Sequence, residues 1–256
     1  MRIRGYAPST PCWVELSCAE PERAAFFYAE LFGWESTGDR FTLGDRAVAG
    51  VGRSVPDRPD GWLPYLSTTD VRATLARVTA AGGHCLAHPA DVPGGIHAII
   101  ADPGGAALGL WQPAGFNGAQ VAAEPGSMAW PDLLTDDAPG AAEFYGAAFD
   151  WLLRHEFGAG EWLTAAHDAV AGLAATPHGS RWRAAFQVAD VTEAVRQCVR
   201  LGGAVASGPA ELGLLCYAEL IDPFGGAFAV EAPAHHPVEL SVSFGYPAGM
   251  EPTFGW

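Results

Sequence analysis

The feature that most constrains this chain is a long internal repeat. The segment PCWVELSCAEPERAAFFYAELFGW, residues 11–34, recurs as MAWPDLLTDDAPGAAEFYGAAFDW, residues 128–151. Aromatic and acidic positions match at a constant spacing, so that Trp13 corresponds to Trp130, which lies 117 positions further along the chain. A repeat of this length predicts that the two halves of the chain have the same fold.

A second pair of blocks supports the same conclusion. Residues 68–83 recur as residues 188–203, and the dipeptide at 102–103, Asp-Pro, recurs at 222–223, both at an offset of 120. The small change of offset between the blocks indicates short insertions, as in a diverged duplication. With 256 residues, two domains of ordinary size are expected.

Composition excludes several functions. Hydrophobic residues make up 49% of the chain, which is enough for a packed core. The net charge of −15 and the pI near 4.7 argue against binding to a nucleic-acid backbone. All 14 basic residues are arginines, which excludes Schiff-base chemistry by lysine and a lysine-containing phosphate loop. The polar N-terminus, the lack of a long apolar run and five cysteines without a CxxC pair predict a cytoplasmic protein with reduced thiols and no membrane contact.

The periodicity of the first block predicts a strand followed by a helix. Residues 12–18 alternate with a period of two, and a helical apolar stripe begins after Pro21 and ends at Gly33. Short strands at 40–43 and 46–53 follow. The resulting unit is β-α-β-β-β, and the same pattern occurs four times.

Four such units, with FYxxLFGW-like helices, GG helix ends and DPxG turns, resemble the vicinal oxygen chelate superfamily. This superfamily includes glyoxalases, bleomycin-resistance proteins, fosfomycin-modifying enzymes and extradiol dioxygenases. The resemblance covers nearly all of residues 10–232, and the run DPGGAALGLWQP at 102–113 is similar to glyoxalase-like proteins tied to antibiotic pathways. It implies an α+β fold with two tandem domains, each a curved mixed sheet with helices outside it.

The repeat and the composition also suggest domain boundaries. We expect a first glyoxalase-like domain at 1–112, a linker rich in Ala, Gly and Pro at 113–126, a second domain at 127–232 and a C-terminal arm at 233–256. The arm contains a strand-like piece, Val238–Phe244, and is expected to pack across the domains.

The resemblance implies one divalent metal in each curved sheet, bound by two histidines and a glutamate. The corresponding positions here are Trp13, Leu63 and Gly109 in the first half, and Trp130, Arg183 and Ala229 in the second. These residues are not metal ligands at neutral pH, so neither a metal nor another cofactor is expected. An alternative is a divalent metal at a non-standard site formed by His84, His88 and His97.

Alternation along the strands indicates which side chains line the concave faces. The predicted lining residues are aromatic or polar: Trp13, Glu15, Tyr65, Ser67 and Trp111 in the first half, and Trp130, Asp132, Arg183, Gln187 and Glu231 in the second. Large aromatic residues beside a few charges are typical of a pocket for a flat, partly apolar ligand. The alternatives are that the tryptophans only fill space and that the acids lie at a rim. Arg183 either forms a salt bridge to Glu231 or Asp132 or anchors a carboxylate or phenolate.

Two functions remain open from the sequence. The first is metal-free binding of an aromatic natural product or drug, for resistance or sequestration, with Trp13, Trp130, Trp111, Tyr65, Ser67 and Gln187 as ligand-binding residues. The second is a cofactor-independent isomerase, cyclase or lyase of secondary metabolism, whose catalytic residues would be Glu15, Asp132, Glu231 and Arg183. A metal-dependent glyoxalase or dioxygenase ranks below both. The expected partner is a small molecule, and the chain is expected to be a monomer or a homodimer.

Overall fold

A computed structural model of the chain describes all residues except 1–2, 4, 57, 157–158, 178 and 235–256. The strand-like piece expected at Val238–Phe244, and almost all of the expected C-terminal arm, lie outside the described residues. Within the described ranges, no helix is both long enough and apolar enough to cross a lipid bilayer.

The first half contains eight strands and two helices. In order they are β1 (Pro11–Cys18), α1 (Pro21–Phe32), β2 (Glu35–Thr37), β3 (Arg40–Leu43), β4 (Arg46–Arg53), β5 (Gly61–Ser67), α2 (Val71–Ala80), β6 (His84–Val92), β7 (Gly95–Ala101) and β8 (Ala107–Pro113). The predicted strand-then-helix block and the hairpin after it are therefore present.

The second half repeats this series. Its elements are β9 (Met128–Thr135), α3 (Ala138–Phe149), β10 (Leu152–Glu156), β11 (Ala159–Leu163), β12 (Ala169–Ala175), β13 (Arg181–Gln187), α4 (Val191–Arg200), β14 (Ala204–Leu212), β15 (Leu215–Ile221) and β16 (Ala227–Pro233). Each of α2 and α4 begins at an aspartate, Asp70 or Asp190, whose carboxylate accepts hydrogen bonds from N–H groups of the first helical turn.

Each half forms one eight-stranded sheet, and the two sheets have the same strand order. The orders are β2-β3-β4-β1-β5-β8-β7-β6 and β10-β11-β12-β9-β13-β16-β15-β14. In both sheets the first strand pairs in parallel with the fourth and antiparallel with the fifth. The predicted α+β class, with four β-α-β-β-β units in two curved mixed sheets, is confirmed.

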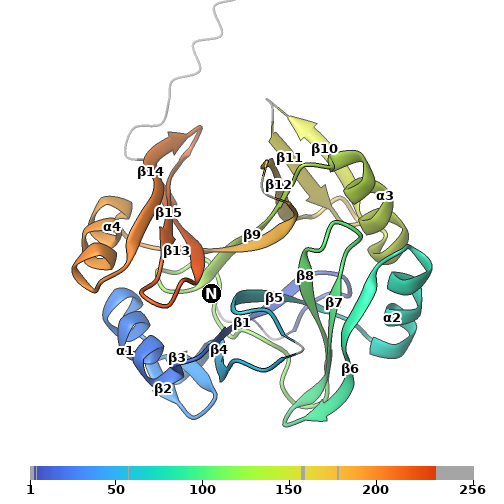
Figure 1. Cartoon of the computed structure of the whole chain (residues 1–256), viewed down its shortest axis with the longest axis horizontal. Helices are drawn as coiled ribbons and strands as arrows, with labels where there is room; N and C mark the ends of the chain where they lie inside the picture. The colour runs from blue at the N-terminus through green and yellow to red at the C-terminus, as the bar shows by residue number, and fades with distance from the viewer. Residues whose placement is uncertain (1–2, 4, 57, 157–158, 178, 235–256) are drawn as a thin grey trace, which may run out of the picture.

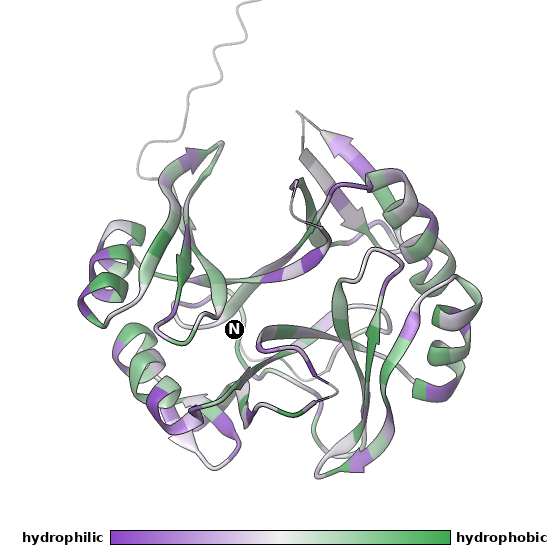
Figure 2. Ribbon diagram, in the orientation of Figure 1, coloured by the Kyte–Doolittle hydropathy of each residue, from purple (hydrophilic) through white to green (hydrophobic). Residues whose placement is uncertain are grey.

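The two sheets pack back to back, and their concave faces open in opposite directions (Figure 1). Helices α1 and α4 lie side by side at one flank, and α2 and α3 at the other. The two largest apolar clusters lie at these flanks, so each combines residues of both halves: the first and fourth units share one, the second and third units the other. Hydrophobic residues follow the sheets, and the helices carry bands of both kinds (Figure 2).

The motifs that reveal the repeat in the sequence form hydrogen-bond chains between the halves. Tyr28 on α1 donates its hydroxyl proton to Asp222 of the second half at 2.8 Å and accepts a bond from the indole N–H of Trp62 at 2.8 Å. An equivalent set of bonds occurs at the other flank, where the second half supplies the tyrosine and the first half the aspartate. Tyr145 on α3 donates to Asp102 at 3.0 Å and accepts from Trp182 at 2.9 Å. The Phe-Tyr and Asp-Pro motifs therefore recur because they satisfy buried polar groups across the interface.

Candidate ligand-binding site

The concave face of each sheet is called a cup below. Cup 1 is formed by β1–β8 and cup 2 by β9–β16. Each cup combines adjacent units of the chain, so Glu15 lies in the same cup as Trp111. The two cups can be compared position by position because their strand registers agree: Glu15 pairs with Leu63 and Gly50, and Asp132 with Arg183 and Gly172.

A glycine lies beneath the acid of the first strand in both cups. A Cβ placed on Gly50 would lie 2.7 Å from Cγ of Glu15, and one placed on Gly172 would overlap the carboxylate of Asp132. The absence of a side chain at these two glycines lets the carboxylate bend over the neighbouring strand. The acids predicted from strand alternation, Glu15 and Asp132, therefore both turn into their cups.

Cup 1 is filled by its own aromatic side chains. The ring of Tyr65 covers Gly109, where a Cβ would overlap it. Phe116, which follows β8, packs edge-on against Trp13 with 4.9 Å between ring centroids, and its carbonyl oxygen accepts a hydrogen bond from the indole of Trp111 at 2.8 Å. The guanidinium of Arg40 lies 4.1 Å from the centroid of the Phe116 ring. The space left in the cup is about 130 Å³.

The charge on Glu15 is neutralised inside cup 1. Arg58, from the loop between β4 and β5, donates to Oε1 of Glu15 at 2.6 Å, and the Tyr65 hydroxyl donates to Oε2 at 3.1 Å. Burial, together with the nearby carboxylate of Glu15, holds the pKa of Tyr65 well above its usual value. Burial lowers the pKa of His97, which also lines this cup, so its imidazole is neutral near pH 7.

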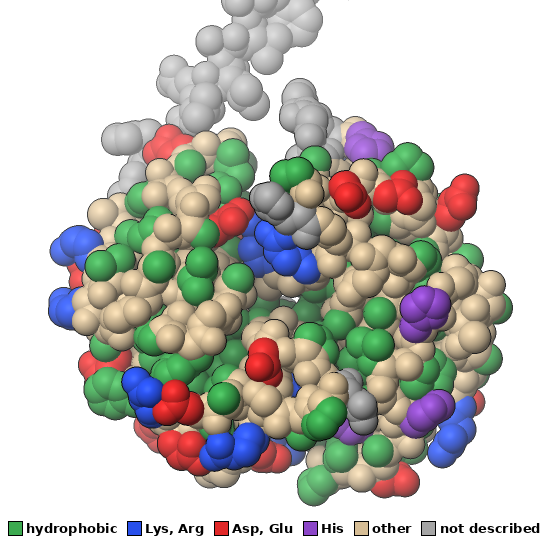
Figure 3. Space-filling model, viewed as in Figure 1, with side chains coloured by type: hydrophobic (Ala, Val, Ile, Leu, Met, Phe, Trp, Pro, Cys, Tyr) green, Lys and Arg blue, Asp and Glu red, His purple; other side chains and the backbone are tan. Residues whose placement is uncertain are grey.

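Cup 2 carries smaller or polar residues at the same positions. Register places Ala185 where cup 1 has Tyr65, and Ala229 where it has Gly109. Glu231 and Tyr217 occupy the positions of Trp111 and His97. These replacements leave a pocket of about 840 Å³ within the described part of the chain. In Figure 3 the molecule is hollowed between its two upper lobes, with basic and acidic side chains gathered at the hollow.

The floor of cup 2 is a network centred on Arg183. Its guanidinium donates to Asp132 at 2.8 Å and also contacts Glu219. The ring of Tyr217 lies 6.0 Å from the same guanidinium. Burial alone would lower the pKa of Arg183, but the two carboxylates more than offset it, so its pKa is raised and the group stays charged. Of the two salt bridges expected for Arg183, the one to Asp132 is present.

Glu231 lies on the wall of the same cup, and its carboxylate makes no hydrogen bond or ion pair with the other described residues. Its side chain is half-buried. Burial raises the pKa of the Glu231 carboxyl, and the nearby Asp132 raises it further, while Arg183 opposes the shift. Glu231 therefore remains a polar group directed at the pocket and available to a ligand.

The structure gathers most of the predicted residues into two sets. Trp13, Glu15, Tyr65 and Trp111 line cup 1, and Trp130, Asp132, Arg183 and Glu231 line cup 2. Ser67 and Gln187 are not among the described residues that line either pocket; they pair in register with Trp111 and Glu231. Four functional-site neighbours were not predicted: Glu219, Tyr217, Phe116 and Arg58. For Glu219 and Tyr217 the sequence offered one indication, the alternation of residues along β15, but it did not show which face of that strand points into the cup.

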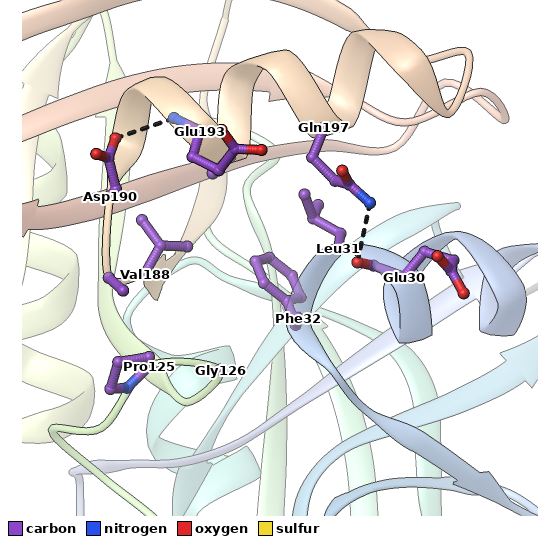
Figure 4. A pocket seen from close by; sticks show the side chains of 11 residues that line it. Glu30, Leu31, Phe32, Pro125, Gly126, Val188, Asp190, Glu193 and Gln197 are labelled. Carbon is purple, nitrogen blue, oxygen red and sulfur yellow. Dashed lines mark hydrogen bonds between the residues drawn. The ribbon is translucent and has the colours of Figure 1, made fainter.

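A second depression lies between α1 and α4 (Figure 4). Its volume is about 390 Å³, and its polar groups already serve the fold: Gln197 donates to the carbonyl of Glu30 at 3.2 Å, and Asp190 caps α4. Phe32 is the aromatic residue in its lining, and that side chain is buried in the core. Cup 2, which is larger and carries a carboxylate without a side-chain partner among the described residues, is therefore the candidate site.

Comparison with known proteins agrees with the fold. Residues 13–110 match the family described as Glyoxalase-like domain. The chain is 33% identical over 280 residues to the anthracycline biosynthesis protein DnrV of Streptomyces peucetius, covering 95% of this chain and 97% of DnrV. The chain belongs to the glyoxalase-like proteins of the vicinal oxygen chelate superfamily.

Two solved structures show the same architecture for this glyoxalase-like chain. The Mn(II)-bound glyoxalase from Novosphingobium aromaticivorans is 15% identical, with a TM-score of 0.63 covering 88% of this chain and 82% of that one. The 2,3-dioxygenase LapB from Pseudomonas sp. KL28 is 16% identical, with a TM-score of 0.63 covering 98% of both chains. At these identities the likeness concerns the fold alone.

The residues at the metal positions implied by the superfamily do not fit a divalent cation. In cup 1 they are Trp13, Leu63 and Gly109, and in cup 2 they are Trp130, Arg183 and Ala229; none offers an imidazole, carboxylate or thiolate. The alternative histidines do not converge. His97 lines cup 1, whereas His84 and His88 are exposed, and the described residues contain no group of three His, Cys, Asp or Glu able to hold a metal ion.

Proposed function

We propose that this protein binds a small, flat, partly apolar aromatic molecule in cup 2. The observation that carries the proposal is the difference between the two cups: cup 2 has Ala185 and Glu231 at the positions where cup 1 has Tyr65 and Trp111. The smaller and polar side chains leave a pocket of about 840 Å³ that the half-buried Trp130 also lines. A pocket of this size with one large aromatic side and a few convergent polar groups suits a ligand of several fused rings. Stacking on the indole would add to the burial of apolar surface.

The relatives suggest the kind of molecule. DnrV and the 34% identical DauV of Streptomyces sp. strain C5 are both named as anthracycline biosynthesis proteins. Anthracyclines are fused aromatic ring systems, which agrees with the shape and lining of cup 2. The proposed role is therefore in antibiotic biosynthesis, as a protein that holds an aromatic intermediate or product.

The proposal is tested by calorimetric titration of the purified protein with doxorubicin, a commercially available anthracycline. We expect saturable binding with one site per chain, and we expect Ala185→Trp to weaken it at least tenfold because the new indole occupies the pocket. Phe116→Ala, which alters cup 1, should leave the affinity unchanged. Absence of saturable binding, or equal binding by Ala185→Trp, would overturn the assignment to cup 2.

The raised pKa of the Glu231 carboxyl favours a second candidate, proton transfer to or from the bound molecule without a cofactor. A group whose pKa moves toward neutrality can act as both acid and base. Incubation of the protein with a bound aromatic ketone in deuterated water, followed by mass spectrometry, would reveal exchange at carbon. Glu231→Gln should abolish exchange while binding persists, and exchange that survives this substitution would remove Glu231 from the role.

Because the residues at the superfamily's metal positions do not fit a divalent cation, the metal content of the purified protein is a direct test of the proposal. Elemental analysis of protein purified without an affinity tag, followed by native mass spectrometry of the same sample, should show no stoichiometric Zn, Mn, Fe or Ni. A co-purified small molecule in the native spectrum would identify the ligand. A stoichiometric metal would contradict the proposed metal-free pocket and would direct attention to His84, His88 and His97.

A further inference from the structure

The charges that line cup 2 are unbalanced. Its lining contains four carboxylates, those of Asp132, Glu161, Glu219 and Glu231, against the two guanidinium groups of Arg181 and Arg183. The lining residues therefore carry an excess of two negative charges, and the ion pair of Glu161 with Arg154, which is outside the lining, reduces this excess to one. In a partly enclosed pocket such an excess acts on a ligand more strongly than it would at an open surface, because solvent screening is weaker there.

Most of these charges already have partners. Arg183 is shared by Asp132 and Glu219, so its positive charge is more than neutralised and is not free to hold an anion. Glu161 forms an ion pair with Arg154. Among the described residues, Glu231 is the carboxylate of the lining without an ion-pair partner, so its negative charge is left to a ligand. The exposed guanidinium of Arg181, which donates to the Thr176 hydroxyl at 3.4 Å, likewise has no carboxylate partner among these residues.

The surroundings of Glu231 suit a positively charged group. Tyr217 is its register partner on β15 and lines the same pocket, as does Trp130 on β9. The faces of aromatic rings attract cations, and this attraction grows where water is excluded. The Glu231 carboxylate thus offers a charge-assisted hydrogen bond to an ammonium group, and the ring of Trp130, which lines the same pocket, offers a cation–π surface.

We infer that cup 2 selects an aromatic cation, with the Glu231 carboxylate accepting a hydrogen bond from a protonated amine of the ligand. This inference rests on the proposed binding of aromatic molecules in cup 2 and adds the charge class of the ligand. It also gives Arg183 a structural role, although a buried arginine in a pocket often binds an anionic group of the ligand. Arg183 holds the two floor acids in place and does not anchor an anionic ligand.

Three planar probes that differ in charge test the inference on the intact protein. They are 9-(aminomethyl)anthracene, 9-(hydroxymethyl)anthracene and 9-anthracenecarboxylate, which at neutral pH are a cation, a neutral molecule and an anion. We expect the ammonium probe to bind roughly tenfold more tightly than the alcohol, in line with a hydrogen bond to a charged group, and the carboxylate probe to bind most weakly. Equal affinities, or tightest binding of the carboxylate probe, would overturn the inference.

Variants separate this inference from the proposed function. Glu231→Gln should lower the affinity for the ammonium probe to that for the alcohol and leave the alcohol unchanged. Glu143→Gln, which removes one charge from the exposed face of α3, is the matched control and should change neither. If the alcohol binds and Ala185→Trp prevents it, but charge has no effect, the aromatic site stands and the cation preference fails. If none of the three probes binds, both fail.

Discussion

Cup 1 and cup 2 share strand order and register but use the concave face differently. Cup 1 places Tyr65, Trp111 and Phe116 in its interior and retains about 130 Å³, whereas cup 2 has Ala185 and Glu231 at the positions of the first two and retains about 840 Å³. Once a fold is duplicated, one copy can fill its cavity with apolar contacts that stabilise the molecule. The other copy can then keep its cavity for a ligand.

The two cups also neutralise their first-strand acid differently. Glu15 in cup 1 is paired with Arg58, which reaches in from a loop and is itself almost fully buried. Asp132 in cup 2 is paired with Arg183, which arises from the adjacent strand at the position of Leu63. Because Arg183 lies in the floor, the pairing leaves the mouth of cup 2 free, whereas Arg58 adds a side chain to cup 1.

The largest effect is expected when cup 2 is given the residues of cup 1. The double variant Ala185→Tyr with Glu231→Trp should lose about a hundredfold or more in affinity for 9-(aminomethyl)anthracene, because the added rings occupy the pocket and the free carboxylate is removed. The loss corresponds to about 2.7 kcal/mol of binding free energy. Fluorescence titration of the probe measures it.

A fold control accompanies this variant. Its thermal unfolding should remain cooperative. Because the Tyr65 ring of cup 1 lies over Gly109 and cup 2 has Ala229 at that position, a triple variant that adds Ala229→Gly is the second test, with the same expected loss of binding. Probe binding retained by a folded double variant would place the site outside cup 2 and would break the comparison between the cups.

The second expected effect concerns the filling of cup 1. Phe116→Ala removes a ring that contacts Trp13, Trp111 and Arg40, and should lower the free energy of unfolding by about 2.5 kcal/mol, less than for a fully buried ring because this side chain is partly exposed. The control is Phe26→Ala on the outer face of α1, where the side chain is 65% exposed and the cost should be below about 0.5 kcal/mol. Urea denaturation measures both; similar costs would mean that Phe116 does not stabilise cup 1.

Much of the fold was predictable because the repeated motifs are the buried contacts themselves. The Phe-Tyr motif places Tyr28 and Tyr145 where each reaches the aspartate of an Asp-Pro turn in the other half. A diverging sequence can change exposed positions freely, but these hydrogen bonds cannot be lost without leaving buried polar groups unpaired. The sequence therefore retained the signal that identifies the four units.

The site was less predictable because it depends on contacts that alternation does not encode. Strand alternation placed Glu15 and Asp132 in their cups, since it requires only the phase of one strand. It could not reveal that Phe116, from a segment expected to be a linker, enters cup 1, or that Glu219 shares Arg183 with Asp132. Ser67 and Gln187 satisfy the alternation but are not among the described residues that line the pockets, although their register partners Trp111 and Glu231 are.

The third expected effect concerns the buried tyrosine hydrogen bonds that are equivalent in the two halves. Tyr28→Phe and Tyr145→Phe each remove a buried hydroxyl that joins an indole N–H to a carboxylate. Each should lower the free energy of unfolding by about 2 kcal/mol, because a buried donor and a buried acceptor lose their partner. Chemical denaturation of both variants checks this. A cost confined to one tyrosine would show that the two flanks are not energetically equivalent.

The smallest effect is the pH dependence that Glu231 gives to stability. Burial, with Asp132 adding to it, raises the folded-state pKa of Glu231 above that of the unfolded chain, which is about 4.3. A raised pKa means that this group stabilises the fold fully only below the unfolded value, and that this contribution is lost as pH rises through the folded value. Glu231→Gln, which cannot ionise, should therefore gain on the wild type between about pH 4 and pH 7.

The gain should stay below about 1 kcal/mol, because the carboxylate is only half-buried and Arg183 partly compensates its charge. Urea denaturation of the wild type, Glu231→Gln and Glu143→Gln at pH 4.5 and pH 7 measures it, and the exposed Glu143 corrects for the change in net charge. If the wild type instead gains on Glu231→Gln as the pH rises, Glu231 must have a cationic partner in the unliganded protein. Its carboxylate would then not be free for an ammonium ligand, and the electrostatic contrast between the cups would have to be reassigned.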